Sequence, residues 1–319
     1  MRLFTLLFAL LLLGSVTPLH AQTAGELTDA DRAALDEAKK EMFELITTIY
    51  TDSSETARFQ ACRDLIRRLV VALDRPNSFN YDFGDVPGLS IMYPDDRSFR
   101  IFTWELYVDS DQYRHYGAIQ LNTEELTLKP LLDRGDEWLE NPENAVVKAN
   151  NWLGYAVYDI VDAGTYRGKP YYFLLGYDSY SIYRRRKLLD VLHFGADGAP
   201  VFGLPVFTTY SESGLLLPDR SRIVLTYGAE ATVALRHDTE LGGIIYENLI
   251  MVPGSHDEGP VSMPDGSYHL LKPTEDGAWQ EEEQIFTHKY EEAPREAAKP
   301  DGGRDLLGRP VVKPGGGGK

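Results

Sequence analysis

The chain has 319 residues, a formal net charge of −17 at pH 7 and a single cysteine. An acidic surface of this kind repels phosphate backbones, so the composition argues against nucleic acid as a partner. Because one thiol cannot form an internal disulfide, the fold depends on its apolar core.

The first 21 residues have the pattern of a signal peptide. Arg2 supplies a positive charge, residues 3–13 form an almost unbroken apolar run, and Ala21 is the small residue that a signal peptidase requires. The apolar run is about half of the roughly 20 residues that span a bilayer, and no second run of that length follows. We therefore expect an exported protein, periplasmic or extracellular, that starts at Gln22 after cleavage and has no integral membrane segment.

Two amphipathic helices are predicted within residues 22–76. Apolar residues recur at three- and four-residue spacing: Leu35, Ala38, Met42, Leu45 and Ile49 in the first helix, and Cys62, Leu65, Ile66, Leu69 and Leu73 in the second. Thr28 with Asp31 predicts the first N-terminal cap, and Ser53 or Ser54 the second. Asp74-Arg75-Pro76 ends the second helix. The short link predicts an antiparallel hairpin, and the position of Cys62 on an apolar stripe indicates a buried thiol rather than a reactive one.

From residue 77 to residue 290 the pattern changes to short β-branched and aromatic runs separated by turn residues, which is typical of strands. The predicted strands are 89–93, 100–108, 116–122, 153–161, 171–177, 188–194, 201–207, 222–227, 232–236, 243–249, 268–271 and 285–290. The pairs Asp197-Gly198, Gly242-Gly243 and Asp265-Gly266 predict chain reversals. Residues 131–151 are predicted to be a long loop with a helical turn around 136–139, and residues 291–319 a disordered tail.

No long helical pattern separates the predicted strands, so parallel βαβ units are disfavoured. The fold class that follows is α+β: an N-terminal helical hairpin packed on a large, mainly antiparallel β domain, built as a sandwich or a meander.

Standard catalytic motifs are absent from the sequence, among them His-Glu-x-x-His, a Walker-type phosphate loop and a Gly-x-Ser-x-Gly elbow. Ser255-His256-Asp257 has the residue types of a catalytic triad, but neighbours on an extended chain point in alternate directions. Asp109 and Asp111, with Asp95 and Asp96 in the preceding turn, offer carboxylates to a calcium ion, although the further ligands of an EF-hand loop are missing. We predict no cofactor, with calcium as the alternative at these aspartates.

One strand and its turn combine aromatic and polar side chains, and they form the candidate ligand-binding surface: Trp104, Tyr107, Asp109, Asp111, Tyr113 and His115. Aromatic faces beside polar groups stack on sugars and hold their hydroxyls, or anchor a protein partner. Residues 184–187, Arg-Arg-Arg-Lys, are the one dense basic run. Strand alternation sends Arg184 and Arg186 to one face and the other two to the opposite face. The run is suited to grip a carboxylate or an anionic glycan, to pair with the protein's own carboxylates, or to discourage edge-to-edge pairing of sheets.

Five segments resemble an exported protein family of unknown function from Bacteroidetes. They are residues 99–104 (Phe-Arg-Ile-Phe-Thr-Trp), 151–155 (Asn-Trp-Leu-Gly-Tyr), 171–178, 187–194 and 198–203. The resemblance covers roughly residues 99–290. It implies export and a β-rich body, and it carries no activity or catalytic residues to this chain.

These patterns together predict a secreted or periplasmic, non-catalytic binding protein that recognises a glycan or an envelope protein partner. Two alternatives stay open: a hydrolase that acts on an envelope polymer with paired carboxylates, and a structural subunit of an envelope assembly. Two carboxylates facing each other across a cleft at about 5–10 Å favour the hydrolase. A flat aromatic patch favours the binding protein, and a large exposed apolar patch favours the structural subunit.

Overall fold

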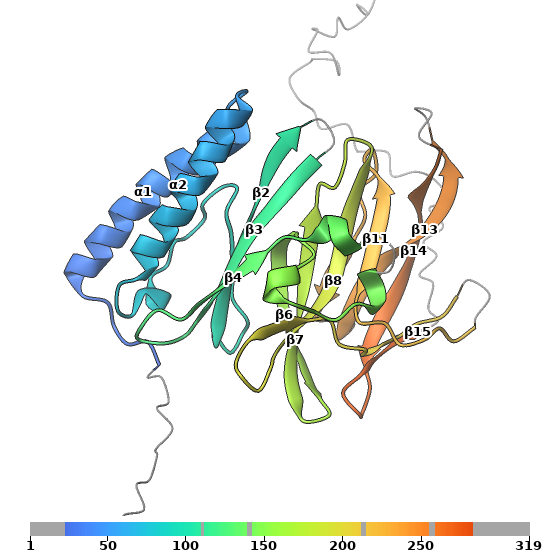
Figure 1. Cartoon of the computed structure of the whole chain (residues 1–319). Helices are drawn as coiled ribbons and strands as arrows, with labels where there is room; N and C mark the ends of the chain where they lie inside the picture. Colours follow the sequence, from blue (N-terminus) through green and yellow to red (C-terminus); the bar gives the residue numbers. More distant parts are fainter. Residues whose placement is uncertain (1–22, 110–111, 139–141, 212–214, 255–258, 283–319) are drawn as a thin grey trace, which may run out of the picture.

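The computed structural model describes residues 23–109, 112–138, 142–211, 215–254 and 259–282 (Figure 1). The predicted signal peptide, Asp111, Ser255-His256-Asp257, the strand at 285–290 and the tail at 291–319 lie outside the described residues. Within the described ranges, no helix is both long enough and apolar enough to cross a membrane.

The predicted helical hairpin is present as α1 (Asp29–Thr51) and α2 (Glu55–Leu73). The Thr28 hydroxyl accepts a hydrogen bond from the Asp31 backbone N–H at 3.1 Å, and Ser54 rather than Ser53 caps α2. Nearly all of the predicted apolar stripe is buried, and Cys62 is among the buried residues of α2. The α+β class is therefore observed, with helices first and strands after them.

The strands form three sheets. The first has the order β1 (Ser90–Met92), β2 (Phe99–Asp109), β3 (Gln112–Leu121) and β4 (Leu128–Leu132). The second has the order β5 (Val147–Lys148), β9 (Pro200–Phe202), β8 (Arg184–Phe194), β7 (Lys169–Asp178) and β6 (Ala156–Tyr166), with β11 (Ile223–Gly228) also paired to β8. The third has the order β10 (Phe207–Thr208), β15 (Trp279–Glu282), β14 (Pro260–Pro273), β13 (Gly243–Pro253) and β12 (Leu235–Asp238). Among these strands only β10 and β15 pair in parallel.

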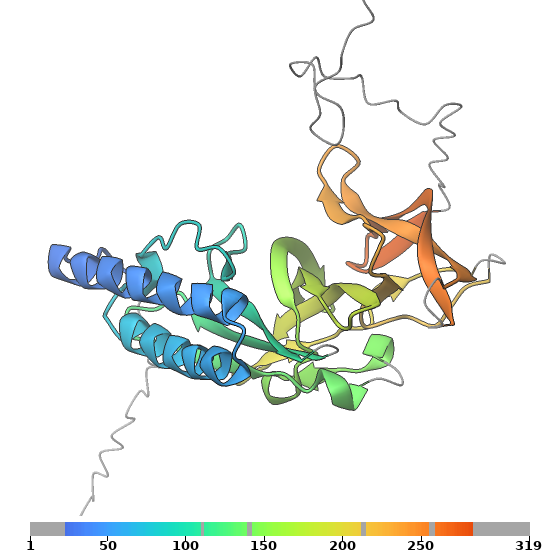
Figure 2. The ribbon, with the colours of Figure 1, turned by 90° about the horizontal axis from the view of Figure 1, so that it is seen from above.

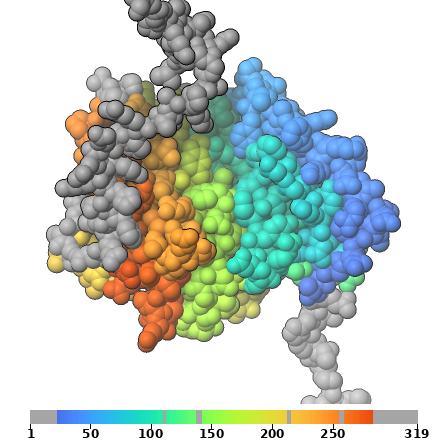
Figure 3. All heavy atoms as spheres, turned by 180° about the vertical axis from the view of Figure 1, so that it is seen from behind, coloured from blue at the N-terminus to red at the C-terminus, as the bar shows by residue number. Residues whose placement is uncertain are grey.

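The hairpin and the three sheets are arranged as successive layers, as the view from above shows (Figure 2). From behind, the layers also follow one another in chain order (Figure 3). An apolar core lies between each pair of adjacent layers. Alternate residues of one strand serve two cores: Trp104 of β2 faces the helices, whereas Ile101 faces the second sheet. The same holds for Leu174 and Leu175 of β7, so the second sheet is covered on both faces.

Two predicted features are wrong in detail. The predicted strand 201–207 is interrupted, because only β9 and β10 at its two ends pair with neighbours. Asp265-Gly266 does not reverse the chain; it forms a bulge within β14, where the pairing register with β13 shifts and Gly266 has φ +82°.

The predicted loop at 131–151 has more structure than its polar sequence indicates. It holds the short 3₁₀ helices η2 (Gly135–Trp138), η3 (Pro142–Asn144) and η4 (Ala149–Asn151) besides β5. A further 3₁₀ turn, η1 (Ser78–Asn80), joins the helices to the first sheet. The sequence did not predict β4 or β15. Pro130 lies in β4, which is tolerated because β4 is the edge strand of its sheet.

Candidate functional site

The polar site lies where the core between the first and second sheets ends. Along β2, every second residue faces the second sheet: Phe99 and Ile101 pack in the apolar core, and the Thr103 hydroxyl accepts the Val157 N–H at 2.9 Å. The next residue on that face is Glu105. Glu105 accepts a hydrogen bond from the hydroxyl group of Ser179, the residue that directly follows β7 of the second sheet. Because side chains alternate between the two faces of a strand, the Glu105 carboxylate lies at the end of the apolar interface between the first and second sheets.

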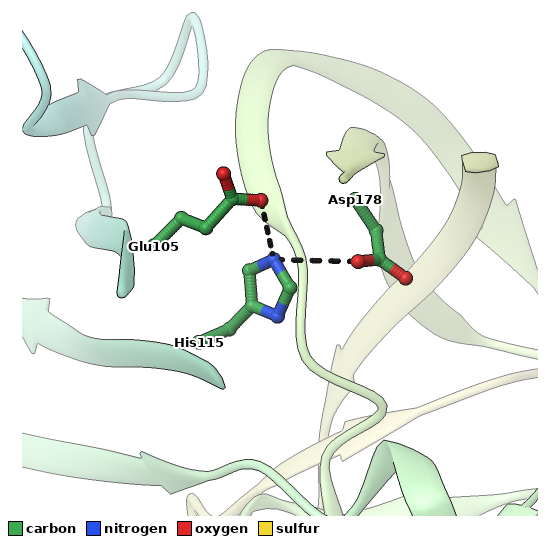
Figure 4. A group of neighbouring side chains, drawn as sticks. All are labelled: Glu105, His115 and Asp178. Atoms are coloured by element: carbon green, nitrogen blue, oxygen red, sulfur yellow. Dashed lines mark hydrogen bonds and ion pairs between the residues drawn. The ribbon is translucent and has the colours of Figure 1, made fainter. Parts of the chain in front are cut away.

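His115 is the centre of the site (Figure 4). It lies directly opposite Glu105 in the β2–β3 pairing, and its side chain is only 4 % exposed. Its Nε2 atom lies 3.2 Å from Glu105 Oε2 and 3.6 Å from Asp178 Oδ1 at the end of β7. Its Nδ1 atom lies 3.5 Å from Asp133 Oδ2. One buried imidazole therefore contacts three carboxylates from three different segments.

Each carboxylate is held by a further group. The Ser179 hydroxyl donates to Glu105 Oε1 at 2.7 Å, and the Ser179 backbone N–H donates to Oε2 at 3.1 Å. The Arg186 guanidinium lies 2.6 Å from Asp178 Oδ2. Asp133 accepts the backbone N–H groups of His115 at 2.8 Å and of Gly135 at 2.9 Å.

Gly154 lets the chain pass close to Asp133. It has φ +77°, and a Cβ atom at this position would lie 2.4 Å from the Asp133 carboxylate. A side chain there would both strain the backbone and displace the carboxylate. The position of Asp133 beside His115 therefore depends on a glycine in the neighbouring loop.

The carboxylates control the ionisation of His115. Burial alone lowers the pKa of this imidazole, but hydrogen bonds to Asp133 and Glu105 and the charge of Asp178 outweigh it and raise the pKa to about 10. Burial raises the pKa of Glu105 and of Asp133, yet the contacts with His115 and the hydrogen bonds from Ser179 and from the Gly135 backbone together outweigh burial and hold both pKa values below their ordinary range. With no cation bound, the site is an imidazolium surrounded by carboxylates.

A cavity of about 430 Å³ opens beside this cluster. His115, Asp133 and Asp178 form its polar wall. Three tyrosines and two arginines complete much of the lining: Tyr113, Tyr180, Tyr183, Arg184 and Arg186. Its volume lies within the range of about 300–1,000 Å³ that is usual for small-molecule sites.

The structure divides the predicted ligand-binding residues. Tyr113 and His115 line the cavity. Tyr107 does not line the cavity; it is 39 % exposed, and its ring centroid lies 5.5 Å from that of Tyr113. Trp104 is instead buried on the opposite face of β2, where it stacks on Tyr116 and its indole N–H donates to the Cys62 sulfur at 3.4 Å.

The described aspartates of the predicted group lie at the two ends of one strand, and Asp111, the predicted partner of Asp109, lies outside the described residues, so the calcium site at these two residues stays a prediction. Asp109 is the last residue of β2, whereas Asp95 and Asp96 precede that strand. A strand of this length separates its ends by roughly 30 Å. Asp96 instead accepts hydrogen bonds from the Ser98 N–H and the Tyr172 hydroxyl.

The basic run behaves as strand alternation predicts. Arg184 and Arg186 line the cavity beside His115, whereas Arg185 and Lys187 line a separate cavity of about 390 Å³. Arg186 pairs with the protein's own carboxylate, Asp178, which is one of the roles expected for this run.

Sequence reasoning missed three of the cluster residues: Glu105, Asp133 and Asp178. Glu105 carried a usable signal, because it is the one acidic residue of the predicted strand 100–108, which is mostly apolar. Asp133 and Asp178 carried no such signal, since each lies at the end of a strand, where many surface aspartates also lie.

The donor atoms of Glu105, His115 and Asp178 lie within 4.8 Å of one another, which is a spacing that fits a metal ion. Comparison of the chain with protein families, curated proteins and solved structures finds no match. The resemblance to a Bacteroidetes family therefore stays a prediction, and the function has to be argued from the site.

Proposed function

We propose that this protein is an exported, non-catalytic binding protein and that its ligand is a glycan held in the cavity beside His115. The observation that carries the proposal is the lining of that cavity, which combines three tyrosines with three aspartates and two arginines. Its export rests on the signal-peptide pattern of residues 1–21.

The lining suits a ligand with hydroxyl groups on a partly apolar ring. Tyrosine faces cover the apolar side of a sugar ring, carboxylates accept from its hydroxyls, and guanidinium groups donate to its oxygens. The Tyr180 ring is held in place, because the Arg186 guanidinium lies 4.0 Å from its centroid and its backbone N–H donates to Asp178 at 2.8 Å. A pre-arranged aromatic wall lowers the entropy lost when a ligand binds.

The hydrolase alternative has less support at this site. Glycoside hydrolysis by paired carboxylates requires one carboxyl group with a raised pKa to act as the acid. Glu105 and Asp133 both have lowered pKa values because each contacts His115. These two groups are suited to remain ionised rather than to donate a proton.

Titration calorimetry with a panel of cell-wall fragments and polysaccharide oligomers tests the proposal. We expect at least one glycan to bind, and we expect Tyr113→Ala and Arg184→Ala each to weaken that binding about tenfold, which corresponds to about 1.4 kcal/mol. Tyr268→Ala is the matched control, since Tyr268 is a partly buried tyrosine of β14 in the third sheet. No binding across the panel, or binding that both cavity variants leave unchanged, contradicts the proposal.

A further inference from the structure

Three donor atoms converge from three strands in the cluster around His115 (Figure 4). His115 Nε2 lies 3.2 Å from Glu105 Oε2 and 3.6 Å from Asp178 Oδ1. Ligands at about 2.0–2.1 Å from a tetrahedral zinc ion lie about 3.4 Å from each other. The two separations from His115 lie on either side of this value, and all three donor atoms lie within 4.8 Å of one another, so a cation fits between them after the two carboxylates adjust.

The charges of the cluster also fit a divalent cation. Glu105, Asp133 and Asp178 bring three negative charges, and Arg186 brings one positive charge. With His115 as an imidazolium the cluster carries one net negative charge, and two net negative charges remain in this largely buried place once a metal ion has displaced the imidazole proton. A divalent ion neutralises them, whereas buried charges without such compensation are costly.

The groups behind the three donors are those that metal sites use to orient their ligands. The Asp133 carboxylate lies beside His115 Nδ1. A carboxylate in this position orients the imidazole ring so that Nε2 points toward the metal. Ser179 holds Glu105 through two hydrogen bonds, and Arg186 holds Asp178. Asp133, Ser179 and Arg186 therefore fix the orientation of the three ligands without themselves binding the metal ion.

We propose that Glu105, His115 and Asp178 form a binding site for a divalent transition-metal ion of the zinc type. One imidazole nitrogen with two carboxylate oxygens is a donor set for such an ion. Calcium is a poorer match, since it takes six to eight oxygen ligands. Three protein ligands leave a coordination position for water or a ligand oxygen, and the cavity adjoins it because His115 and Asp178 line that cavity.

The metal site stands independently of the glycan proposal, and direct metal titration tests it. Chelator-treated full-length protein is titrated calorimetrically with zinc chloride, and in parallel with calcium and magnesium chloride. We expect one zinc ion per chain with micromolar or tighter affinity, and weaker binding of the other two ions. Cobalt(II) is a second probe. When it is bound in a low-symmetry site with a nitrogen ligand, it absorbs visible light more strongly than the aqueous ion does.

Glu105→Gln and Asp178→Asn keep side-chain size and remove one charged donor each. We expect each to weaken zinc binding at least tenfold and to reduce the cobalt absorption, with the far-ultraviolet circular dichroism spectrum unchanged. Glu281→Gln is the matched control, since Glu281 also pairs with a histidine, His269, outside this cluster. The proposal is overturned if the wild-type protein binds no zinc, or if both cluster variants bind zinc and cobalt as the wild type does.

Discussion

The third sheet contains another carboxylate–histidine pair, Glu281 with His269. The structure predicts how the contribution of Glu281 to the stability of the fold depends on pH. The Glu281 carboxylate is 6 % exposed, pairs with His269 and accepts the Tyr210 N–H at 3.0 Å. Burial raises the pKa of Glu281, but these contacts outweigh burial, so the folded-state pKa lies below its ordinary value of 4.5. A carboxylate of this kind stabilises the fold above its unfolded-state pKa, and the contribution is lost as the pH falls through the folded-state value.

Glu281→Gln is therefore expected to lower the free energy of unfolding by about 1–3 kcal/mol at pH 7 and by less at pH 4. Urea unfolding of both proteins at the two pH values measures the difference. Glu282→Gln is the control, because Glu282 is a neighbour on β15 whose side chain is 44 % exposed, and we expect little change from it. A loss for Glu281→Gln that is equal at both pH values contradicts the assignment.

At the scale of elements, the helical hairpin is part of the same core as the first sheet. Leu65 of α2 is fully buried in that core, and Cys62 contacts Trp104 of β2. The link between them is also fixed, since Arg100 donates to the Ser78 carbonyl at 2.9 Å and Gln120 donates to the Ser78 hydroxyl at 2.9 Å. The hairpin should therefore unfold together with the first sheet rather than detach from it.

Leu65→Ala is expected to destabilise the protein by about 2–5 kcal/mol through the cavity it leaves. Cys62, the only thiol, reports on this interface: its reaction with a thiol reagent should begin at the urea concentration at which circular dichroism records loss of strands. Val71→Ala on the same helix is the control, since Val71 is 61 % exposed and its truncation should cost little. Thiol labelling at a clearly lower urea concentration than sheet unfolding would show that the hairpin opens alone.

Features that depend on neighbouring residues were predictable from the sequence, whereas features that depend on the packing of distant elements were not. The helices and most strands follow from local patterns, such as the caps at Thr28 and Ser54 and the run of aromatic and aliphatic residues along β2. The site does not, because Glu105, Asp133 and Asp178 meet only after two sheets pack face to face. The aromatic and acidic neighbours of His115 in sequence mark it as a candidate, whereas its partners in the cluster include Asp178, a residue from another sheet. The same neighbours mark Trp104, which lies on the opposite face of β2.

At the scale of the whole molecule, the second sheet is the layer that holds the others together. Its central strands β7 and β8 are buried on both faces, and Leu174 and Leu175 reach the two different cores. The near-continuous apolar sequence of β7 is typical of a strand without a solvent face. The third sheet differs, because β13 ends in exposed residues such as Ile250 and Met251.

This asymmetry predicts the order of protection in hydrogen exchange. Amides that open only by global unfolding exchange most slowly, and these should lie in β7 and β8. Amides near Ile250 and Met251 open through local fluctuations and should exchange at least about tenfold faster. Native-state hydrogen exchange read by mass spectrometry, with peptides that separate β7 from β13, measures both. If the slowest amides lie instead in α1 and α2, the first core and not the second sheet limits unfolding, and the central role assigned to β7 and β8 is wrong.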